Sequence, residues 1–317
     1  MTPPDEPLDD DDVLNKPEVS LVVVAFHRSE HLDALLGATA DRRIELVVVN
    51  IEQDPDVHMI CTRHFAIEVM VPNNPGYGAA VNRGVAAAHA PVVLFSNDDL
   101  EYDAAAVRCL AAAVRPGGAD VAVPRVIGSG GTPVRSVQAV PSLRSLVLEW
   151  ALLPDTPVSW LARRISVEKW RAPNVPERIH AASGLAVAVR HDLIVECPLP
   201  EVYFLYWEES EWFALLGRRG AHVEFRPEVS VVHLGGRAVA SPEKSALLAR
   251  NAVRCIRRLY GRRAARAAYA VTIAWQFRLV LTGLARVTTK PSRPTRSLLT
   301  ARVAGLRSAL TSWNETL

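Results

Sequence analysis

The chain has 317 residues, of which 49% are hydrophobic and 22% are charged. These values are typical of a soluble globular protein with a sizeable core, in one large domain or two smaller ones. The net charge of +2 conceals an asymmetry, because residues 241–317 carry 15 Lys and Arg but only two acids. A basic tail on an acidic body predicts contact with an anionic partner, with a solvated pair of basic helices as the alternative.

Neither the cysteines nor the N-terminus indicates secretion. The four cysteines are far apart and form no CxxC pair, which disfavours a disulfide framework or a zinc site and favours a cytoplasmic protein. Residues 1–16 are acidic and Pro-rich, the opposite of a signal peptide, and are predicted to be a disordered leader. The apolar stretch 264–287 contains three arginines, which argues against a transmembrane span but leaves an interfacial helix open.

Short apolar runs rich in β-branched residues alternate with helical patterns through residues 20–124, which predicts an α/β fold with a mostly parallel sheet flanked by helices. The expected elements are strands at 20–26, 45–50, 64–71, 92–95 and 120–124, and helices at 29–40, 78–88 and 104–114. Further on we expect a helix at 143–153, regular structure at 182–190, a helix at 208–219, strands at 223–225 and 229–236, and helices beyond 241. Ligands bind at the carboxyl ends of such strands, where Asn50 and residues 97–99 fall.

A small-residue turn introduces the helix at 78–88. Gly76 and Gly78 allow backbone conformations and close approaches that a Cβ would block, and Asn74 and Asn82 can hydrogen-bond locally or to a ligand. The turn contains neither GxGxxG nor GK[ST], so it is not a Rossmann or P-loop motif. By itself it fits a tight connection equally well.

Two carboxylates and a histidine end predicted strands. Asp98 and Asp99 come directly after an apolar strand, where hard oxygen ligands suit Mg²⁺ or Mn²⁺, although such residues also cap strands. His233 precedes two glycines and is either a core residue or part of a loop that admits phosphate.

Three further carboxylates open a predicted helix. They are Glu208, Glu209 and Glu211, and they follow an aromatic run. The helix dipole favours acids in a first turn, so they are either structural or include a general base for an acceptor hydroxyl. A helix N-terminus is expected to lower the pKa of such a base and keep it ionised.

Together these segments resemble the family 2 glycosyltransferases of the GT-A fold, particularly the bacterial rhamnosyltransferase-like members. Five segments match the family's motifs in the family's order. They are Asn74-x-Gly-Tyr-Gly-x-Ala-x-Asn82-x-Gly84, Leu94–Glu101, Ala182–Ala186, Phe204–Trp212 and Val231–Gly236. The resemblance implies a GT-A domain at 17–240 and a basic helical extension at 241–317.

The resemblance also implies roles for individual residues. Glu209 takes the position of the catalytic base with Glu208 beside it, and Asp99 and His233 take the positions that hold Mg²⁺ or Mn²⁺. The expected acceptor-side residues are Gly184 and Glu211. The expected donor-binding residues are Phe26, Arg28, Asn50, Asn74, Gly76, Tyr77, Gly78, Asn82, Asn97 and Asp98.

The implied reaction is inverting transfer of a sugar from a nucleoside-diphosphate donor, dTDP-rhamnose or a UDP-sugar, to a hydroxyl of a glycan or polyprenyl-linked acceptor. A non-catalytic sugar-nucleotide-binding protein and a sugar-phosphate nucleotidyltransferase are the alternatives. The absence of a recognition motif argues against a nucleic-acid partner. The basic tail is similar to those of enzymes that act on polyprenyl-linked sugars at the inner membrane face, and Trp275 and Phe277 suit an interfacial helix.

Two departures from the family pattern bear on the site. Glu209 stands where the family usually has Asp, so the carboxylate is one methylene further from the backbone. Asn50-Ile-Glu-Gln-Asp54 replaces the family's Asp-Asn/Asp-Gly-Ser segment, so Asn50 is expected to pair with the edge of a pyrimidine base.

Overall fold

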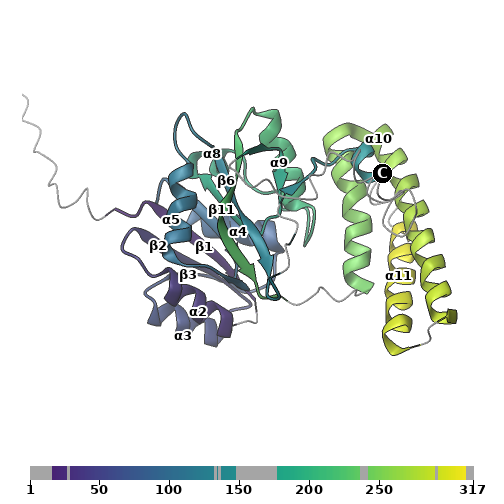
Figure 1. Ribbon diagram of the computed structural model, residues 1–317, viewed down its shortest axis with the longest axis horizontal. Helices are drawn as coiled ribbons and strands as arrows, with labels where there is room; N and C mark the ends of the chain where they lie inside the picture. Colours follow the sequence, from purple (N-terminus) through teal and green to yellow (C-terminus); the bar gives the residue numbers. More distant parts are fainter. Residues whose placement is uncertain are drawn as a thin grey trace, which may run out of the picture.

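The computed structural model describes residues 16–26, 29–131, 134, 137–147, 177–235, 242–289 and 292–311. A sheet covered by helices forms the body of the protein, and the C-terminal helices stand together on one side of it (Figure 1). The predicted leader lies outside the described residues except for Lys16, as do Arg28 and the end of the helix predicted at 143–153. The predicted fold class, α/β with a C-terminal helical extension, is confirmed.

The main sheet has the order β3-β2-β1-β4-β10-β6-β11-β5, with β8 paired to β11. Neighbours from β3 to β4 run parallel, as do β6 and β11, whereas β10 is antiparallel to both of its neighbours and β5 is antiparallel to β11. The strands are β1 Val19–Ala25, β2 Ile44–Ile51, β3 Ile67–Val71, β4 Val92–Asn97, β5 Leu100–Glu101, β6 Val121–Gly128, β8 Glu177–Ile179, β10 Ala186–Arg190 and β11 Val223–His233. A separate pair joins β7 Val137–Gln138 to β9 Ala181–Ala182.

Helices bury both faces of the sheet, which explains why the strands are apolar on both sides. One face packs against α2 Ser29–Thr39, α3 Pro55–Arg63 and α5 Ala104–Ala113. The other packs against α4 Tyr77–Ala86, α8 His191–Glu196 and α9 Glu208–Arg218. Helix α4 comes so close that a Cβ on Gly84 would lie 2.3 Å from Val22 Cγ1, so glycine permits this packing.

The structure corrects three expectations. Residues 55–63 form α3, which begins with Asp54 as N-cap and Pro55 in the first turn, and the strand predicted from 64 begins only at Ile67. Residues 191–196 form α8, a helix too short to show clear periodicity. The two strands expected at 223–225 and 229–236 are one strand, β11, with a register shift between Arg226 and Ser230 against β6.

The strand pairing gathers the chemically interesting residues. The carboxyl ends of the parallel strands β1, β2 and β4 lie side by side, which places Phe26, Asn50 and Asn97 along one edge. The pairing of β5 with β11 sets His233 opposite Leu100, one residue beyond Asp99. Two residues 134 positions apart, Asp99 and His233, therefore meet because of sheet topology.

The C-terminal extension consists of α10 Pro242–Thr289 and α11 Arg293–Thr311, with a break in α10 at Gly261, where φ is 83°. Short helix α6 Leu143–Leu146 packs against α10. Among the described residues, the helical stretch Lys244–Thr289 is long and apolar enough, by length and composition, to cross a membrane, and 22% of its most apolar window is buried.

Candidate active site

Asp99 and His233 form the acidic–imidazole pair of the site. The Nε2 atom of His233 lies 3.2 Å from Oδ2 of Asp99, and the N–H of Leu234 donates to the carbonyl of Asp99 at 2.9 Å. A Cβ at Gly235 would lie 2.6 Å from both His233 Nε2 and Asp99 Oδ2. Glycine therefore leaves open the space next to both atoms. The sequence marks Gly235 only as part of the loop after His233, and its contact with Asp99 appears only in the structure.

These residues fit a divalent cation. Carboxylate oxygen and imidazole nitrogen are both used for Mn²⁺, and Mg²⁺ or Mn²⁺ commonly keeps several waters and takes further ligands from substrate phosphates. Within the described parts of the chain, no group of three or more His, Cys, Asp and Glu side chains converges as a cage. Asp99 and His233 would thus supply two ligands and leave the remaining positions to a diphosphate and water.

The neighbours of Asp99 organise the strand ends. Oδ2 of Asp98 accepts a hydrogen bond from the N–H of Phe26 at 3.0 Å, which ties the exit of β1 to the exit of β4. The N–H of Asn97 donates to the carbonyl of Leu185 at 3.1 Å, beside Gly184. The ring of Phe26 is exposed, as stacking on a nucleotide base requires.

Asn50 shapes a loop rather than facing the solvent. Its amide nitrogen donates to the carbonyl of Asp54 at 2.9 Å and to Oε1 of Glu68 at 2.7 Å, and its Oδ1 accepts from the N–H of Asp54 at 2.8 Å. These bonds hold a turn in which Glu52 and Gln53 have positive φ. Both hydrogens of the amide are thus engaged within the protein, so pairing of Asn50 with a nucleotide base, which stays a prediction, would use the amide oxygen.

The small-residue turn packs directly on the acidic segment. Oδ1 of Asn74 accepts from the N–H of Gly76 at 3.0 Å, and the N–H of Tyr77 donates to the carbonyl of Phe204 at 3.0 Å. Gly76 has a φ of 91°, and a Cβ there would lie 2.4 Å from that carbonyl oxygen. Gly76 is thus required by both its conformation and its contact, and Gly78 packs similarly against the carbonyl of Pro200.

Asn82 hydrogen-bonds to the segment that precedes the acidic helix. Its Oδ1 accepts from the N–H of Leu199 at 3.0 Å, and its Nδ2 donates to the carbonyl of Leu199 and to Oε1 of Glu201, both at 2.9 Å. The amide of Asn82 thus satisfies both the N–H and the carbonyl of Leu199, as a paired β-strand would. Asn82 therefore fixes the segment that leads to the acidic helix, and a contact of Asn82 with the donor stays a prediction.

Tyr77 joins the small-residue turn to Gly184. Its hydroxyl donates to the carbonyl of Gly184 at 2.9 Å. Burial, followed by the negative charges of Glu208, Glu209 and, more weakly, Asp99, raises the pKa of Tyr77 well above its usual value. The phenol is therefore neutral, and carboxylates from both halves of the site lie near it.

The acidic helix begins after a strained turn. Tyr206 and Trp207 have φ values of 69° and 81°, a left-handed conformation that costs roughly 1–2 kcal/mol per residue. Burial, then the neighbouring Glu209, raises the pKa of Glu208 to about 8, and burial also raises the pKa of Glu209. The expectation that the helix N-terminus lowers these values is wrong, because backbone hydrogen bonds favour the charged forms but burial outweighs them.

Replacing Glu208 by Gln should flatten the dependence of stability on pH. Glu208 is 3% exposed, and its Oε2 has no hydrogen-bond partner among the described residues. Because its pKa is raised in the folded state, the stability it supports is complete below its unfolded pKa and is lost as the pH rises through about 8. Denaturant titrations at pH 5 and pH 8 measure the free energy of unfolding. Relative to the wild type, this free energy should be higher for Glu208→Gln at pH 8 than at pH 5 by a few kcal/mol. Parallel curves for the two proteins would contradict this.

A cavity of about 320 Å³ opens next to Glu209. Its lining includes Tyr206, Trp207, Glu209 and Ser210 of the acidic segment, and Leu248 and Trp275 of α10. A Cβ on Gly184 would lie 3.1 Å from the Cβ of Glu209, so Gly184 lies against the stem of this side chain. The aromatic rings and the carboxylate together suit a sugar ring with a hydroxyl directed at Glu209.

Glu211 is not on the acceptor side. It is 1% exposed, accepts a hydrogen bond from the hydroxyl of Tyr203, and pairs with Nε of Arg258 at 2.8 Å. Arg258 belongs to α10, so this buried carboxylate joins the acidic helix to the C-terminal extension. The side chain points into that interface instead of the cavity, which corrects the expectation for Glu211.

Arg258→Met should destabilise the protein by about 2–4 kcal/mol, since it leaves the buried Glu211 carboxylate without its cation. The guanidinium is partly exposed, so the loss should be smaller than for a fully buried pair. The adjacent Arg257 forms no ion pair with the described residues, and Arg257→Met should stay within about 0.5 kcal/mol of the wild type. Equal midpoints for both variants in urea would refute the role of the pair.

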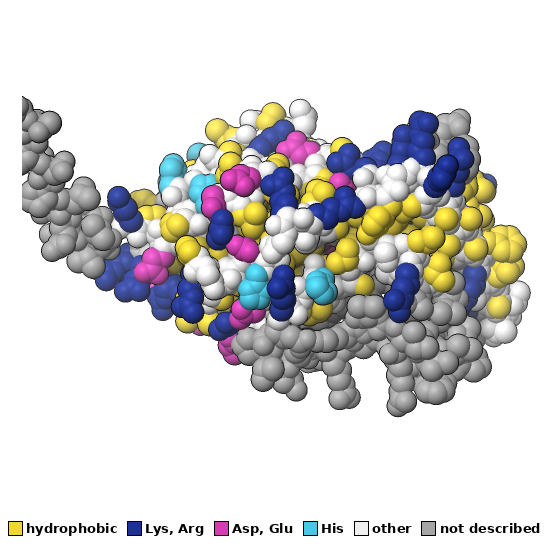
Figure 2. Space-filling model, turned by 90° about the horizontal axis from the view of Figure 1, so that it is seen from above, with side chains coloured by type: hydrophobic (Ala, Val, Ile, Leu, Met, Phe, Trp, Pro, Cys, Tyr) yellow, Lys and Arg dark blue, Asp and Glu magenta, His cyan; other side chains and the backbone are white. Residues whose placement is uncertain are grey.

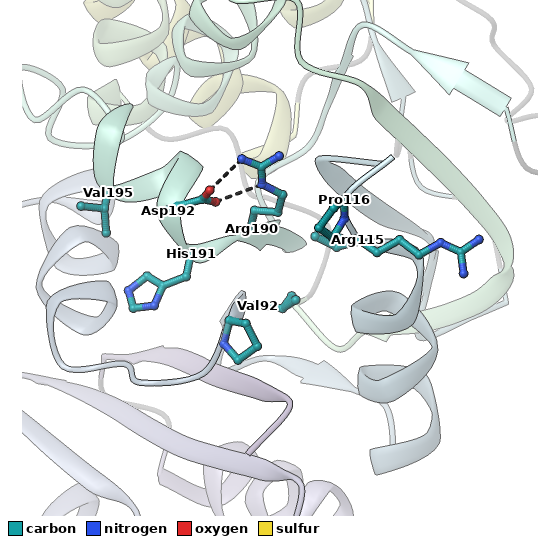
Figure 3. Close-up of a pocket in the computed structure, with 9 residues that line it drawn as sticks. Val92, Arg115, Pro116, Arg190, His191, Asp192 and Val195 are labelled. Atoms are coloured by element: carbon teal, nitrogen blue, oxygen red, sulfur yellow. Dashed lines mark hydrogen bonds and ion pairs between the residues drawn. The ribbon is translucent and has the colours of Figure 1, made fainter. Parts of the chain in front are cut away.

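A larger cavity, about 610 Å³, lies at the other end of the sheet (Figure 3). Its walls include Val92 at the start of β4 and Val195 of α8, and Arg190 there is paired with Asp192 at 2.7 Å. The cavity is thus at the amino end of β4, whereas Asp99 follows the carboxyl end. The larger of these two cavities is therefore not the one next to the candidate active site.

Comparison with known proteins places this geometry in a family. The family model described as Glycosyl transferase family 2 matches residues 20–183, just over half of the chain. The chain belongs to glycosyl transferase family 2. The matched residues include the Gly76 turn and Asp99, while α9 and His233 lie beyond them.

Curated relatives of this family 2 protein match over a short stretch. Uncharacterized glycosyltransferases of Mycobacterium tuberculosis and Mycobacterium bovis are 38% identical over 86 residues, which is 27% of this chain. The match spans 38% of the length of those relatives.

Solved structures share the fold. A mannosyltransferase of Pyrobaculum calidifontis, solved with GDP-mannose and Mn²⁺, gives a TM-score of 0.52 at 15% identity, covering 95% of this chain and 88% of that one. Glucosyl-3-phosphoglycerate synthase of M. tuberculosis, solved with Mn²⁺, UDP and glucosyl-3-phosphoglycerate, gives 0.52 at 18% identity, covering 77% and 80%. At these identities the likeness establishes the GT-A fold alone.

Proposed function

We propose that this family 2 protein is an inverting glycosyltransferase that moves a sugar from a nucleoside-diphosphate donor to a hydroxyl of a glycan or lipid-linked acceptor. The observation that carries the proposal is the contact that joins the acidic segment to the end of β4. The Tyr77 hydroxyl donates to the carbonyl of Gly184, which lies against the stem of Glu209. The N–H of Asn97, two residues before Asp99, donates to the carbonyl of the next residue, Leu185. The donor-side pair is Asp99 and His233, and the acceptor-side pair is Glu208 and Glu209. A diphosphate bound by the first pair would present its sugar to the second.

The donor half is built to hold a diphosphate. A divalent cation bound by Asp99 and His233 would neutralise charge on the diphosphate as it departs. The structurally similar proteins were solved with Mn²⁺ and GDP-mannose or UDP, which supports a nucleotide-sugar donor and Mg²⁺ or Mn²⁺ here. The exposed ring of Phe26 would stack on the nucleotide base. A dTDP-rhamnose or UDP-sugar donor follows from the sequence resemblance.

The acceptor half is built to remove one proton. Near neutral pH the buried Glu208 retains its proton, because its pKa is about 8. In the proposed mechanism Glu209 is the ionised member of this coupled pair. Glu209 faces the cavity, where its carboxylate takes the proton of the acceptor hydroxyl. The acceptor oxygen then forms a bond to the anomeric carbon as the bond from that carbon to the diphosphate oxygen breaks. In-line displacement inverts the anomeric configuration.

A panel of nucleotide sugars tests the donor half directly. A donor that binds the native state raises the thermal midpoint, and only in the presence of Mn²⁺ or Mg²⁺ if Asp99 and His233 act through the cation. The same panel, assayed for release of nucleoside diphosphate, distinguishes a transferase from a binding protein without activity. Release of pyrophosphate from a nucleoside triphosphate and a sugar phosphate would instead indicate a nucleotidyltransferase.

We also propose that the C-terminal helices bind the surface of an anionic membrane, as a lipid-linked acceptor requires. Phe277, Leu281 and Leu284 recur every three or four residues along α10 and are 55%, 51% and 46% exposed. Hydrophobic side chains gather over this helical region, with Lys and Arg nearby (Figure 2). Helices α10 and α11 contain 14 Lys and Arg residues and one acid, Glu243, which matches the charge of anionic head groups.

Sedimentation with vesicles measures this association. The protein should pellet with vesicles containing phosphatidylglycerol, remain in solution with phosphatidylcholine alone, and be released by high salt. A triple change of Phe277, Leu281 and Leu284 to Ser should weaken pelleting without altering donor binding. Equal recovery with both lipids, or none with either, would count against the proposal.

A further inference from the structure

The turn that leads into the acidic helix is held by the C-terminal extension. Trp207 precedes α9 without a side-chain cap, and its φ of 81° follows the φ of 69° at Tyr206. Two bulky residues in the left-handed region persist only where surrounding contacts determine their conformation. Helix α10 supplies such contacts, from a residue 46 positions further along the chain than Leu205.

Asn251 provides those contacts. Its Nδ2 donates to the carbonyl of Leu205 at 3.0 Å and to the carbonyl of Tyr206 at 3.1 Å, the two carbonyls that precede Trp207. The side chain is 1% exposed, and its Oδ1 has no hydrogen-bond partner among the described residues. The amide of Asn251 therefore interacts with the turn through these two donated hydrogen bonds.

Neighbouring residues on the same face of α10 extend the contact. Arg254 donates to the carbonyl of Val202 at 2.8 Å, and Arg258 pairs with Glu211. Positions 251, 254 and 258 have the spacing of one helix face. This face thus contacts the acidic segment before, at and after the turn that sets the direction of Glu208 and Glu209.

We infer that α10 is a positioning element for the base, and that Asn251 is a positioning residue that holds the Tyr206–Trp207 turn so that Glu209 faces the acceptor cavity. The inference rests on the proposed role of Glu209. Among the described residues, the hydrogen bonds of Asn251 go to this turn and not to the donor-side pair, Asp99 and His233. Loss of Asn251 should therefore impair the chemical step more than donor binding.

Asn251→Leu tests the inference, because Leu is similar in size and donates no hydrogen bond. Gln276→Leu is the matched control: Gln276 is also a fully buried amide of α10, but its side chain packs beside Gly305 of α11.

Hydrogen exchange reads the positioning without any substrate. The N–H of Glu211 donates to the carbonyl of Trp207 at 3.0 Å, so its protection depends on the turn. Exchange of the amides at 211–214 should accelerate by at least about tenfold in Asn251→Leu and remain unchanged in Gln276→Leu. This readout tests the positioning even if no nucleotide sugar is turned over.

Kinetics then separates positioning from general stability. With the donor found in the panel and Mn²⁺, kcat for Asn251→Leu should fall about 10–100-fold while the donor KM changes by less than about threefold. Should Asn251→Leu not fold, Asn251→Ser, which keeps one hydroxyl donor, gives the same comparison with a smaller loss. Equal exchange in Asn251→Leu and Gln276→Leu, or a loss confined to KM, would overturn the inference. A wild-type protein inactive on every donor would instead refute the proposed function.

Discussion

Glu209→Gln should lower the rate of sugar transfer by about 10³-fold while leaving the donor KM nearly unchanged. Gln has almost the same shape as Glu and cannot accept the proton of the acceptor hydroxyl. The variant should remain folded, because it removes a carboxylate whose pKa is raised by burial. Steady-state kinetics with Mn²⁺ and the donor found in the panel measures the effect.

Glu196→Gln serves as the control for this change. Glu196 is an exposed acid at the end of α8, outside the site, and its replacement should leave kcat within about twofold of the wild type. If Glu209→Gln kept a rate within a few-fold of the wild type while Glu208→Gln lost activity, the base would be Glu208. Retention of activity in both variants would show that neither carboxylate removes the proton.

Asp99→Asn should reduce transfer by about 10²–10³-fold and remove the dependence of the remaining activity on Mn²⁺. Asn preserves the size of the side chain but replaces a charged ligand next to His233 with a neutral amide. The midpoint shift that Mn²⁺ and donor together produce in the wild type should shrink accordingly. Thermal shift and kinetics on the same preparations give the two measurements.

Asp103→Asn is the matched control for Asp99→Asn. Asp103 accepts a hydrogen bond from the N–H of Ala106 as the N-cap of α5, and Asn caps helices about as well. This variant should keep both its activity and its response to Mn²⁺. An Asp99→Asn protein that still responded fully to Mn²⁺ would place the cation elsewhere.

Two features of the structure surround Glu209, the glutamate that stands where the family usually has Asp. Gly184 lies against the Cβ of Glu209, and the turn before α9 is held in a left-handed conformation. Both features affect where the carboxylate lies relative to the cavity. The extra methylene, the small residue beside it and the direction of the turn therefore all bear on the position of the Glu209 carboxylate, the proposed base.

Local sequence patterns were sufficient for much of the fold. Apolar β-branched runs predicted β1, β2, β4 and β6 within a few residues of their ends, because strands buried on both faces have little choice of composition. Helix α8 escaped prediction because one and a half turns show no periodicity. Gly76 was correctly marked from its sequence, and the reason, contact with Phe204, appears only in the structure.

The chemical groups of the candidate site can be recognised from the amino-acid sequence alone. The Asp98-Asp99 pair after a strand, the acids that open α9 and the histidine before two glycines can all be read without coordinates. The aspartates and the histidine follow strands whose apolar pattern is local, so their place in the chain predicts their place at a carboxyl end of the sheet. The acids that open α9 are placed by the packing of that helix.

The roles of individual residues came from contacts between distant segments. Asn50 and Asn82 hydrogen-bond to backbone groups and to the carboxylates of Glu68 and Glu201. Glu211 pairs with Arg258, and burial raises the pKa of Glu208. Hydrogen-bond partners and burial depend on which segments the fold brings together, and no local pattern contains that information. For this reason the sequence by itself determined which chemical groups make up the candidate site, whereas only the contacts of the tertiary structure decided what surrounds each of them.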